Sequence, residues 1–595
     1  MYRLAIQLLS TTLLTFLFVG CGGGGDSSTA TTPIAFGASS IAADCVGTGC
    51  SATTSGSINT YSGSGTGVWR FNNTASVQAI GTLDIEGLAA GKTVTLIYSN
   101  SSPDTNASTA PSPGILAAPA TQPITTPLAS GLDPKAIMPI AGLDHTSHHR
   151  ILEANRRAMS DMRWDAVSTE SSKSVRINAA PAVPISVTVG SIKDWSENAF
   201  GSGGNTQPVI PITYSTTAKV VCPAGTLGRK VVIWVQTSSY PSLITASKLT
   251  DYQNSFCGTN NNDGRYAQVA NAIGDVWGPV PSTYSATTIS DTISQKQDVN
   301  IVIIDPGMGA TWGGYFYSLN NRLKTTSPAY ANSNEALLFF VNARQSTSYT
   351  QSVLIHELTH MINYYQRWIL NNDQYETWLE ETTAMMTQDI FDLGLTLSGG
   401  ACVPIVCDLR SYAASGAGIS YFNWPFDTIS NNHYYMGASF GAYLNRRFGP
   451  HIYLQLTTDC YTAPANTSGR TCLDLLIKAN GGNSFDEEFA RFGASVFGRM
   501  GGVGEPVNFG FPSKSGTVAL KTTNGAGIIS PNFNYNLPAI NSWWSGLAMP
   551  ATPTITSLPY SAHVYRVDTV ASGKTNYVRN NVSIPAKTSL TVIVK

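Results

Sequence analysis

The sequence predicts an α/β protein with a lobe built on a mixed sheet, a second lobe that is mainly helical, and small β domains at both ends. Three observations lead to this prediction. Apolar runs such as 299–304 alternate with helical patterns between residues 136 and 372. Helical periodicity then dominates from 373 to 503. Short strand patterns separated by turn residues fill the two end regions, 41–102 and 504–595.

The composition of the chain argues against partners that bind through charge. Only 12% of the 595 residues are Asp, Glu, Lys or Arg, and the formal net charge is −1. Ser, Thr, Asn and Gly take the place of charged residues, so the charged share is about half the usual one of roughly 25%. Nucleic acid is therefore not an expected partner, and neither is a membrane held by charge alone.

Residues 1–21 have the pattern of a lipoprotein signal peptide. Arg3 precedes an apolar stretch that is short for a membrane span. The stretch ends in Phe-Val-Gly-Cys at 18–21, which resembles a lipobox and implies that Cys21 is lipidated and anchors the exported chain to a membrane. No Asp follows Cys21 directly, which in bacteria with two membranes implies the outer membrane or the cell surface. A conventional secretory peptide without an anchor is the alternative.

The region that follows divides by composition. Residues 22–40 begin with four Gly and read as a flexible tether. In the small β domain 41–102, the clearest strands are 67–71 and 92–98. A linker rich in Pro, Ala, Ser and Thr covers 103–135 and leads to the first lobe.

Cysteine usage agrees with export. Without Cys21, eight of the nine Cys remain, an even and widely spaced set that is typical of disulfides in an oxidising compartment. Their order suggests local pairs, although a sequence alone does not fix the connectivity. The suggested pairs are Cys45–Cys50, Cys222–Cys257, Cys402–Cys407 and Cys460–Cys472.

The most informative motif lies in 352–365, a run without Pro or Gly that predicts a buried helix. It contains His356-Glu357-Leu358-Thr359-His360. Residues four apart lie on one face of a helix, so His356 and His360 can direct two imidazoles at one metal ion. Glu357 lies one step round the helix, within reach of a water on that metal. This is the H-E-x-x-H arrangement found in zinc peptidases.

A third metal ligand is expected on a second predicted helix, 373–390. Glu381 shares a stripe with Trp378, Met385 and Gln388 that should face the interior, and a buried carboxylate needs a partner such as a metal. Its neighbour Glu380 lies on a polar, solvated stripe and is the second choice for the third metal ligand. Glu381 is therefore the preferred ligand.

These motifs resemble those of a known class of metallopeptidase. Asn363 and Gln366 stand where a metzincin has Gly and His, so that class is excluded. His-Glu-Leu-Thr-His followed by Trp-Leu-Glu-Glu at 378–381 resembles the gluzincins, and the wider context, roughly 136–500, is similar to the hyicolysin family of secreted bacterial metallopeptidases. The resemblance implies the two-lobed gluzincin fold and Zn²⁺ held by His356, His360 and Glu381. Glu357 would be the general base of peptide hydrolysis.

The resemblance also implies a second catalytic group in the helical lobe. The segment from His433 to Leu444 resembles the Tyr-x-x-Gly helix start that follows the third ligand in aminopeptidase-type gluzincins. On that match Tyr434 donates to the oxyanion of the transition state. Tyr435 and His433 remain open as alternatives, and simple packing of these aromatic residues at a helix entry is the structural alternative.

The expected substrate is a protein or peptide, cleaved internally, because the Gly-x-Met-Glu-Asn run of the clan's aminopeptidases is absent. Residues 313–316 could bind it as an edge strand, by strand addition. The region 504–595 reads as a β-sandwich-like domain, and the terminal β domains could contact glycans or surface proteins. The alternative function is a non-catalytic, adhesin-like binding protein on a peptidase scaffold, although the intact Glu357 argues against it.

Overall fold

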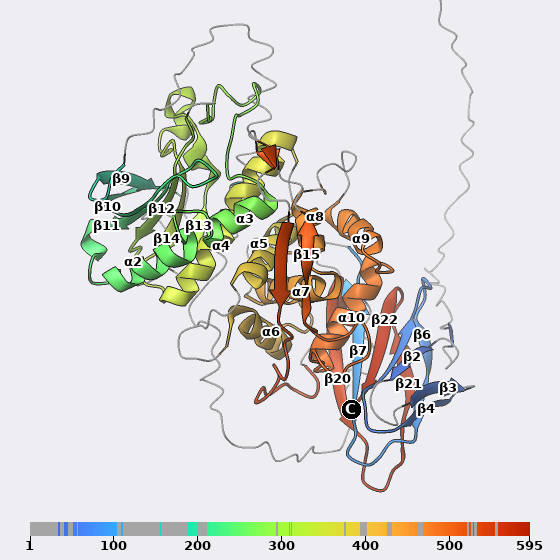
Figure 1. Cartoon of the computed structure of the whole chain (residues 1–595). Helices are drawn as coiled ribbons and strands as arrows, with labels where there is room; N and C mark the ends of the chain where they lie inside the picture. Colours follow the sequence, from blue (N-terminus) through green and yellow to red (C-terminus); the bar gives the residue numbers. More distant parts are fainter. Residues whose placement is uncertain are drawn as a thin grey trace, which may run out of the picture.

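Figure 1 shows the computed structural model of the chain. The structure describes residues 34–35, 41–45, 51–55, 58–103, 109–110, 155, 187–198 and 211–595, the last with gaps at 293–294, 309, 311, 374–375, 393–401, 425–430, 459, 461–467, 520–522, 525–526, 529–531 and 554–556. The predicted signal peptide with Cys21, and most of the tether and linker, lie outside the described residues. Within them, no helix combines the length and the apolar character that a membrane crossing requires.

A six-stranded sheet forms the α/β part, in the order β13-β14-β12-β11-β10-β9. The central strands β11, β12 and β14 run parallel, whereas β13 at one edge and β10 and β9 at the other run antiparallel to their neighbours. The strands are β9 (Ile192–Glu197), β10 (Ile212–Cys222), β11 (Val231–Gln236), β12 (Val299–Ile304), β13 (Gly314–Phe316) and β14 (Leu337–Asn342). The mixed sheet predicted from the sequence is present, and the 313–316 segment does supply an edge strand.

The sheet separates two hydrophobic cores, which explains the continuous apolar runs of its central strands. Ile301 and Phe339 face the larger core, together with residues of α2 (Ala246–Tyr252), α3 (Arg265–Ile273) and α4 (Thr347–Asn363). Val302 and Phe340 face a smaller core on the opposite side. Because both faces of β12 and β14 are buried, every position along them is apolar or neutral, as in other parallel sheets.

Helices dominate the described part of 373–503, as the sequence predicts. They are α5 (Thr377–Phe391), α6 (Pro404–Ser415), α7 (Asn431–Phe448), α8 (His451–Thr458), α9 (Gly469–Ala479) and α10 (Phe485–Phe497). A chain of buried hydroxyls joins α4 to this group. Thr359 Oγ1 of α4 donates to Thr387 Oγ1 of α5 (3.0 Å), which lies 2.7 Å from the hydroxyl of Tyr453 on α8. These bonds hold α4 against α5, the helix that carries Glu381.

The two ends of the chain form one β-sandwich, so the prediction of a separate β domain at each end is wrong. One sheet has the order β2-β5-β22-β7-β20; in the other, β6 pairs with β1, β4 and β21, and β3 extends it beyond β4. The strands are β1 (Ile34–Ala35), β2 (Ile41–Cys45), β3 (Ser51–Ser55), β4 (Ile58–Ser62), β5 (Gly67–Asn72), β6 (Ala79–Glu86), β7 (Thr93–Asn100), β20 (Ala562–Thr569), β21 (Asn576–Ile584) and β22 (Thr588–Val594). Pairing between segments so far apart leaves no local pattern in the sequence.

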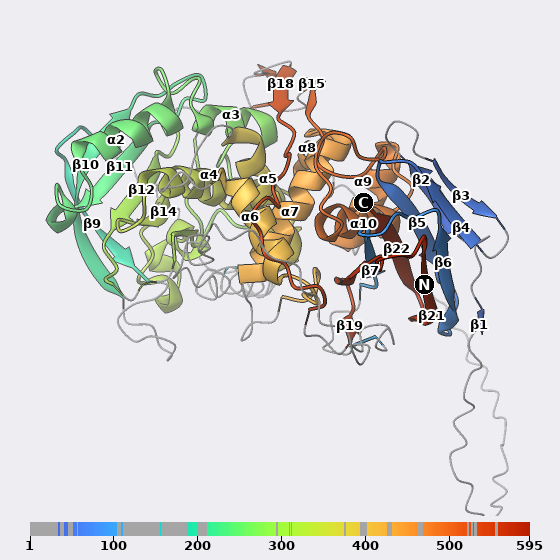
Figure 2. The ribbon, with the colours of Figure 1, turned by 90° about the horizontal axis from the view of Figure 1, so that it is seen from below.

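The sandwich packs on the helical part through the sheet that contains β22 (Figure 2). Along β5 and β7, Trp69 and Leu96 point into the sandwich, whereas their neighbours Val68 and Ile97 join the main core beside α10. This alternation follows from the two-residue period of a strand. His563 of β20 completes the contact, because its ring stacks on Phe489 of α10 with 4.2 Å between centroids.

Three smaller differences correct the predicted boundaries. Within 504–595, β15 (Lys514–Ala519) and β18 (Asn532–Leu537) pair with each other beside α7 and do not join the sandwich (Figure 1). The predicted tether contains β1. The predicted linker contains β8 (Thr109–Ala110), which pairs with β19 (Leu558–Pro559). β1 and β8 are thus paired with strands that are distant in the sequence, whereas β15 and β18 form a local hairpin-like pair.

The structure contains three of the suggested disulfides. Cys222 is bonded to Cys257, Cys402 to Cys407, and Cys460 to Cys472. The fourth suggested pair, Cys45–Cys50, lies outside the described side chains. The three bonds join residues that are 35, 5 and 12 positions apart in the sequence, respectively.

Candidate metal centre

Helix α4 holds the H-E-x-x-H residues in the interior of the molecule. Ser346 caps the helix, because its side chain accepts a hydrogen bond from the Tyr349 N–H. His356, Glu357 and His360 are 6, 2 and 2% exposed. Such polar groups are rarely buried unless other groups compensate for the lost hydration. The site therefore needs partners for two imidazoles and for the carboxylates around them.

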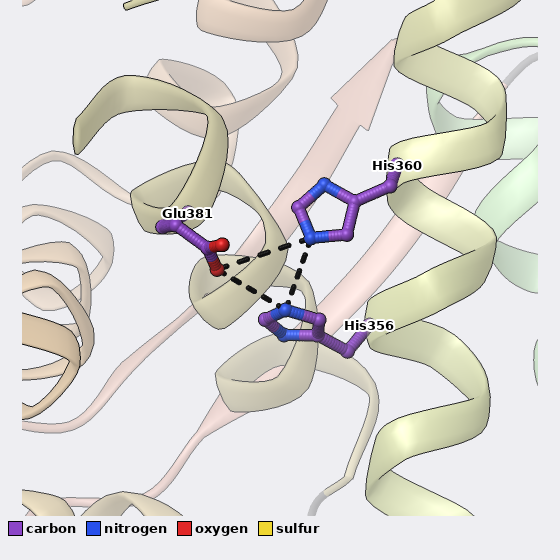
Figure 3. A group of neighbouring side chains, drawn as sticks. All are labelled: His356, His360 and Glu381. Atoms are coloured by element: carbon purple, nitrogen blue, oxygen red, sulfur yellow. Dashed lines mark hydrogen bonds and ion pairs between the residues drawn. The ribbon is translucent and has the colours of Figure 1, made fainter. Parts of the chain in front are cut away.

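Three donor atoms converge from α4 and α5 (Figure 3). His356 Nε2 lies 3.1 Å from His360 Nε2 and 3.2 Å from Glu381 Oε2, and His360 Nε2 lies 3.8 Å from the same oxygen. A tetrahedral zinc ion with bonds of about 2.0–2.2 Å separates its ligand atoms by about 3.3 Å. The donor set and its spacing thus fit one divalent cation. Three protein ligands are also the number found in catalytic zinc centres, whereas structural centres use four.

The outer nitrogens of both imidazoles are hydrogen-bonded. His356 Nδ1 lies 3.3 Å from Gln388 Oε1, and His360 Nδ1 lies 2.8 Å from Glu380 Oε1. Both partners are acceptors, so each Nδ1 carries the proton and each Nε2 presents its lone pair to the metal position. Outer partners of this kind fix the ring orientation of metal-binding His residues.

Glu380 differs from the prediction of a solvated surface residue. Its side chain is 18% exposed and is bonded to His360 and to Asn363 Nδ2 (3.2 Å). Burial lowers the pKa of His360, but the hydrogen bond to Glu380 and the nearby carboxylates outweigh burial and raise it above its ordinary value. The carboxylates of Glu380, Glu381 and Glu357 thus favour a positive charge at His360.

The sequence indicates no role for Gln388, and the structure shows one. Its Oε1 faces His356, while its Nε2 donates to Ser352 Oγ at 2.7 Å, which sets the orientation of the amide. A signal was present, because Gln388 lies seven residues after Glu381 on the same inward stripe. Ser352 lies four residues before His356 and therefore on the same face of α4.

The side chain of Glu357 extends from α4 to the edge strand β13. Its Oε2 accepts a hydrogen bond from the Phe316 N–H at 2.9 Å. Gly314 permits this close approach, because a Cβ there would lie 2.5 Å from Val353 Cγ1 and 3.2 Å from Glu357 Cγ. The carboxylate predicted to act as the general base is thus held directly by the strand predicted to bind substrate.

Of the three residues considered as oxyanion donors, Tyr434 contacts the centre. Its hydroxyl donates to Glu381 Oε1 at 3.2 Å. Burial and the charge of Glu381 raise the pKa of Tyr434 well above its ordinary value, so the phenol keeps its proton. His433 instead packs on Trp424, with 5.5 Å between ring centroids, and Tyr435 is only half-buried.

Comparison with solved structures gives only a distant likeness. A substrate-bound mutant of an M1 zinc metallopeptidase from Deinococcus radiodurans is 14% identical, with a TM-score of 0.26 over 52% of this chain and 62% of that one. The present chain thus spans less than two thirds of that peptidase, and the score is too low to establish a shared fold. No curated protein matches the chain.

Comparison with family models is more informative. A domain of unknown function (DUF8571) matches residues 43–111, which supply the N-terminal strands of the sandwich. The model of peptidase M30 matches residues 213–595, well over half of the chain. This range includes β13, Tyr434 and the two helices that carry the three converging donors, and it confirms the resemblance to hyicolysin-like metallopeptidases at the level of the family. The chain belongs to the peptidase M30 family.

Proposed function

We propose that this chain is a zinc-dependent endopeptidase of the gluzincin type. The observation that carries the proposal is the convergence of His356 Nε2, His360 Nε2 and Glu381 Oε2 within 3.8 Å of one another. Two imidazoles and one carboxylate form a known ligand set of catalytic zinc sites. The buried carboxylate of Glu357 beside them supplies the base that hydrolysis requires.

The chemistry divides between the metal and the protein. His356, His360 and Glu381 would hold the zinc ion, which when bound would supply a Lewis acid that lowers the pKa of a water molecule towards about 7 and polarises the scissile carbonyl. Glu357 accepts a proton from the attacking water as the new C–O bond forms, and donates it to the amide nitrogen as the C–N bond breaks. The Phe316 N–H holds the carboxylate during this exchange. The products are a carboxylic acid and an amine, and Glu357 is ionised again at the end.

Tyr434 is the proposed donor to the oxyanion, turning its hydroxyl from Glu381 to the substrate. Tyr434→Phe is expected to lower kcat about 10²- to 10³-fold with little change in KM, because the donor acts only in the transition state. Steady-state kinetics on one fluorogenic peptide measure this effect. Tyr435→Phe is the matched control and is expected to retain activity; equal losses in both variants, with full zinc content, would contradict the role of Tyr434.

The proposed enzyme acts outside the cytoplasm, anchored through a lipid on Cys21 to the outer membrane or cell surface, where it cleaves proteins or peptides. The signal-like residues 1–21 and the disulfide-bonded cysteines support this location. An adhesin-like protein without activity is the second candidate. It is less well supported, because simple binding does not require a base held beside three converging metal donors.

Removal of the metal tests the proposed function. The purified chain is expected to bind about one zinc ion and to hydrolyse a casein-type substrate. A chelator should abolish hydrolysis, and stoichiometric zinc should restore it. Metal analysis and hydrolysis are measured on the same samples. Hydrolysis that continues after the bound metal has been removed would rule out the proposal.

A further inference from the structure

The edge strand β13 ends at Phe316, whose two backbone polar groups are both bonded to side chains. β13 is the outermost strand of the six-stranded sheet and pairs there with β14 alone. The Phe316 N–H donates to Glu357 Oε2 at 2.9 Å. The Phe316 carbonyl accepts a hydrogen bond from Asn155 Nδ2 at 3.0 Å. Asn155, which precedes Phe316 by 161 positions, and the proposed general base thus bind the same residue.

The amide of Asn155 also binds the backbone just beyond Phe316. Its Oδ1 accepts a hydrogen bond from the Ser318 N–H at 2.7 Å. Ser318 begins the short helix η6 (Ser318–Asn321), and the first N–H groups of a helix have no partner within the helix. Turning the amide over would set its NH2 against the Ser318 N–H and its oxygen against the Phe316 carbonyl, so its orientation is fixed.

These bonds are shielded from water. Asn155 is 5% exposed, and Phe316 and Ser318 are buried as well. A buried polar group that loses its partner is costly, so water does not readily replace either bond. The ring of Phe316 also packs on Tyr364, with 5.5 Å between centroids. That apolar contact has no direction, whereas the hydrogen bonds of Asn155 specify how the peptide groups are turned.

The direction of the Phe316 N–H depends on this arrangement. The N–H and the carbonyl of Phe316 belong to successive peptide groups that are joined at its Cα. Because Asn155 holds the second peptide group on the carbonyl side, it limits rotation about that Cα and so restrains the first. The N–H of the first group is the donor to Glu357. A general base acts only when it lies within hydrogen-bond reach of the proton that it accepts.

We propose that Asn155 is a positioning residue for peptide hydrolysis, which holds the Glu357 carboxylate in its working orientation through the backbone of Phe316. This inference rests on the proposed peptidase function and adds to it a residue that lies outside both helices with the converging donors. Asn155 touches neither the substrate nor the three donor residues in this role. Its whole effect on the reaction passes through Glu357.

Two substitutions in the full-length, zinc-loaded protein test the inference. Asn155→Leu has a similar size and makes neither bond. Asn155→Asp keeps the acceptor for the Ser318 N–H, but its carboxylate cannot donate to the Phe316 carbonyl. Each is expected to lower kcat about 10- to 100-fold, as a misplaced catalytic group does, with KM within about twofold and zinc content unchanged. Asn73→Leu, which removes a buried Asn that donates to carbonyls in the sandwich, is the matched control and should retain kcat.

A double-mutant cycle separates positioning from general stability. Because Asn155 acts through Glu357, adding Asn155→Leu to Glu357→Gln should lower the single-turnover rate by less than about twofold. A residue that only stabilised the fold would add its full loss. A second measurement does not use activity: amide hydrogen exchange of residues 313–318 in the zinc-free protein should be faster in Asn155→Leu than in the wild type.

The inference is overturned by additive losses in the double variant, by wild-type kcat in either single variant, or by unchanged exchange of 313–318. A loss of activity that follows a loss of zinc also overturns it. If Asn155→Leu does not fold, the same cycle and exchange measurements are made with Asn155→Asp. The peptidase proposal fails separately, when the wild type itself hydrolyses no substrate; with an active wild type, only the role of Asn155 is at stake.

Discussion

Glu357→Gln is expected to lower kcat about 10²- to 10⁴-fold, the usual contribution of a general acid–base group. The amide keeps the shape of the side chain and can still accept the hydrogen bond from the Phe316 N–H. It cannot take a proton from the attacking water. Because Glu357 is not among the three converging donors, the variant should bind zinc as the wild type does.

The measurement is single-turnover hydrolysis of a casein-type or fluorogenic substrate, with zinc content determined on the same preparation. Glu86→Gln, at an exposed position of β6, is the matched control and should be fully active. A Glu357→Gln enzyme with normal turnover would remove Glu357 from the mechanism. A variant that is inactive because it has lost zinc would show instead that Glu357 supports the metal.

Substitutions of the neighbouring glutamates Glu381 and Glu380 on α5 are expected to differ in whether saturating zinc restores activity. Glu381→Ala removes one of the three metal donors, so bound zinc should fall far below one per chain and hydrolysis should fall to background. Glu380→Gln keeps an acceptor for His360 Nδ1 but loses its charge. It should weaken zinc binding by about 10- to 100-fold, the usual effect of an outer partner, and recover activity when zinc is saturating.

Zinc affinity is measured in metal-buffered titrations, and activity is measured at each free zinc concentration. Circular dichroism in the absence of zinc checks that both variants fold. If Glu380→Gln abolished zinc binding and Glu381→Ala retained it, the two residues would have to exchange roles. The 0% exposure of Glu381 and its distance of 3.2 Å to His356 Nε2 argue against that exchange.

Local periodicity is sufficient to predict the α/β part, the helical part and the convergence of His356, His360 and Glu381. The i, i+4 spacing of His356 and His360 is a property of any helix, and the inward stripe of α5 selected Glu381 over Glu380. The same stripe contained Gln388, but a neutral amide gives no sign of function until its partner is known. The stripe pattern of α5 describes only residues of that helix. The hydrogen-bond partner of Glu380 is His360 of α4, so the sequence does not indicate the role of Glu380.

The sequence does not predict the part of the fold in which strands from the two ends of the chain pair with one another. The sequence predicts the strands at 67–71 and 92–98, but their patterns do not reveal that β22 lies between β5 and β7. Strand patterns specify which residues face a core; they do not specify which strand is the neighbour. The two ends were therefore assigned to two domains when they build one.

This shared sandwich has a consequence for the order in which the molecule can fold. The Asn73 side chain donates to the Ile584 carbonyl, which is 511 positions away. Contacts of such high sequence separation form slowly, and the N-terminal strands keep unpaired edges until the final strands emerge during synthesis. The sandwich is therefore completed last, after the helices around the metal position have been made, and a chain interrupted before β20 would leave β5 and β7 open to aggregation.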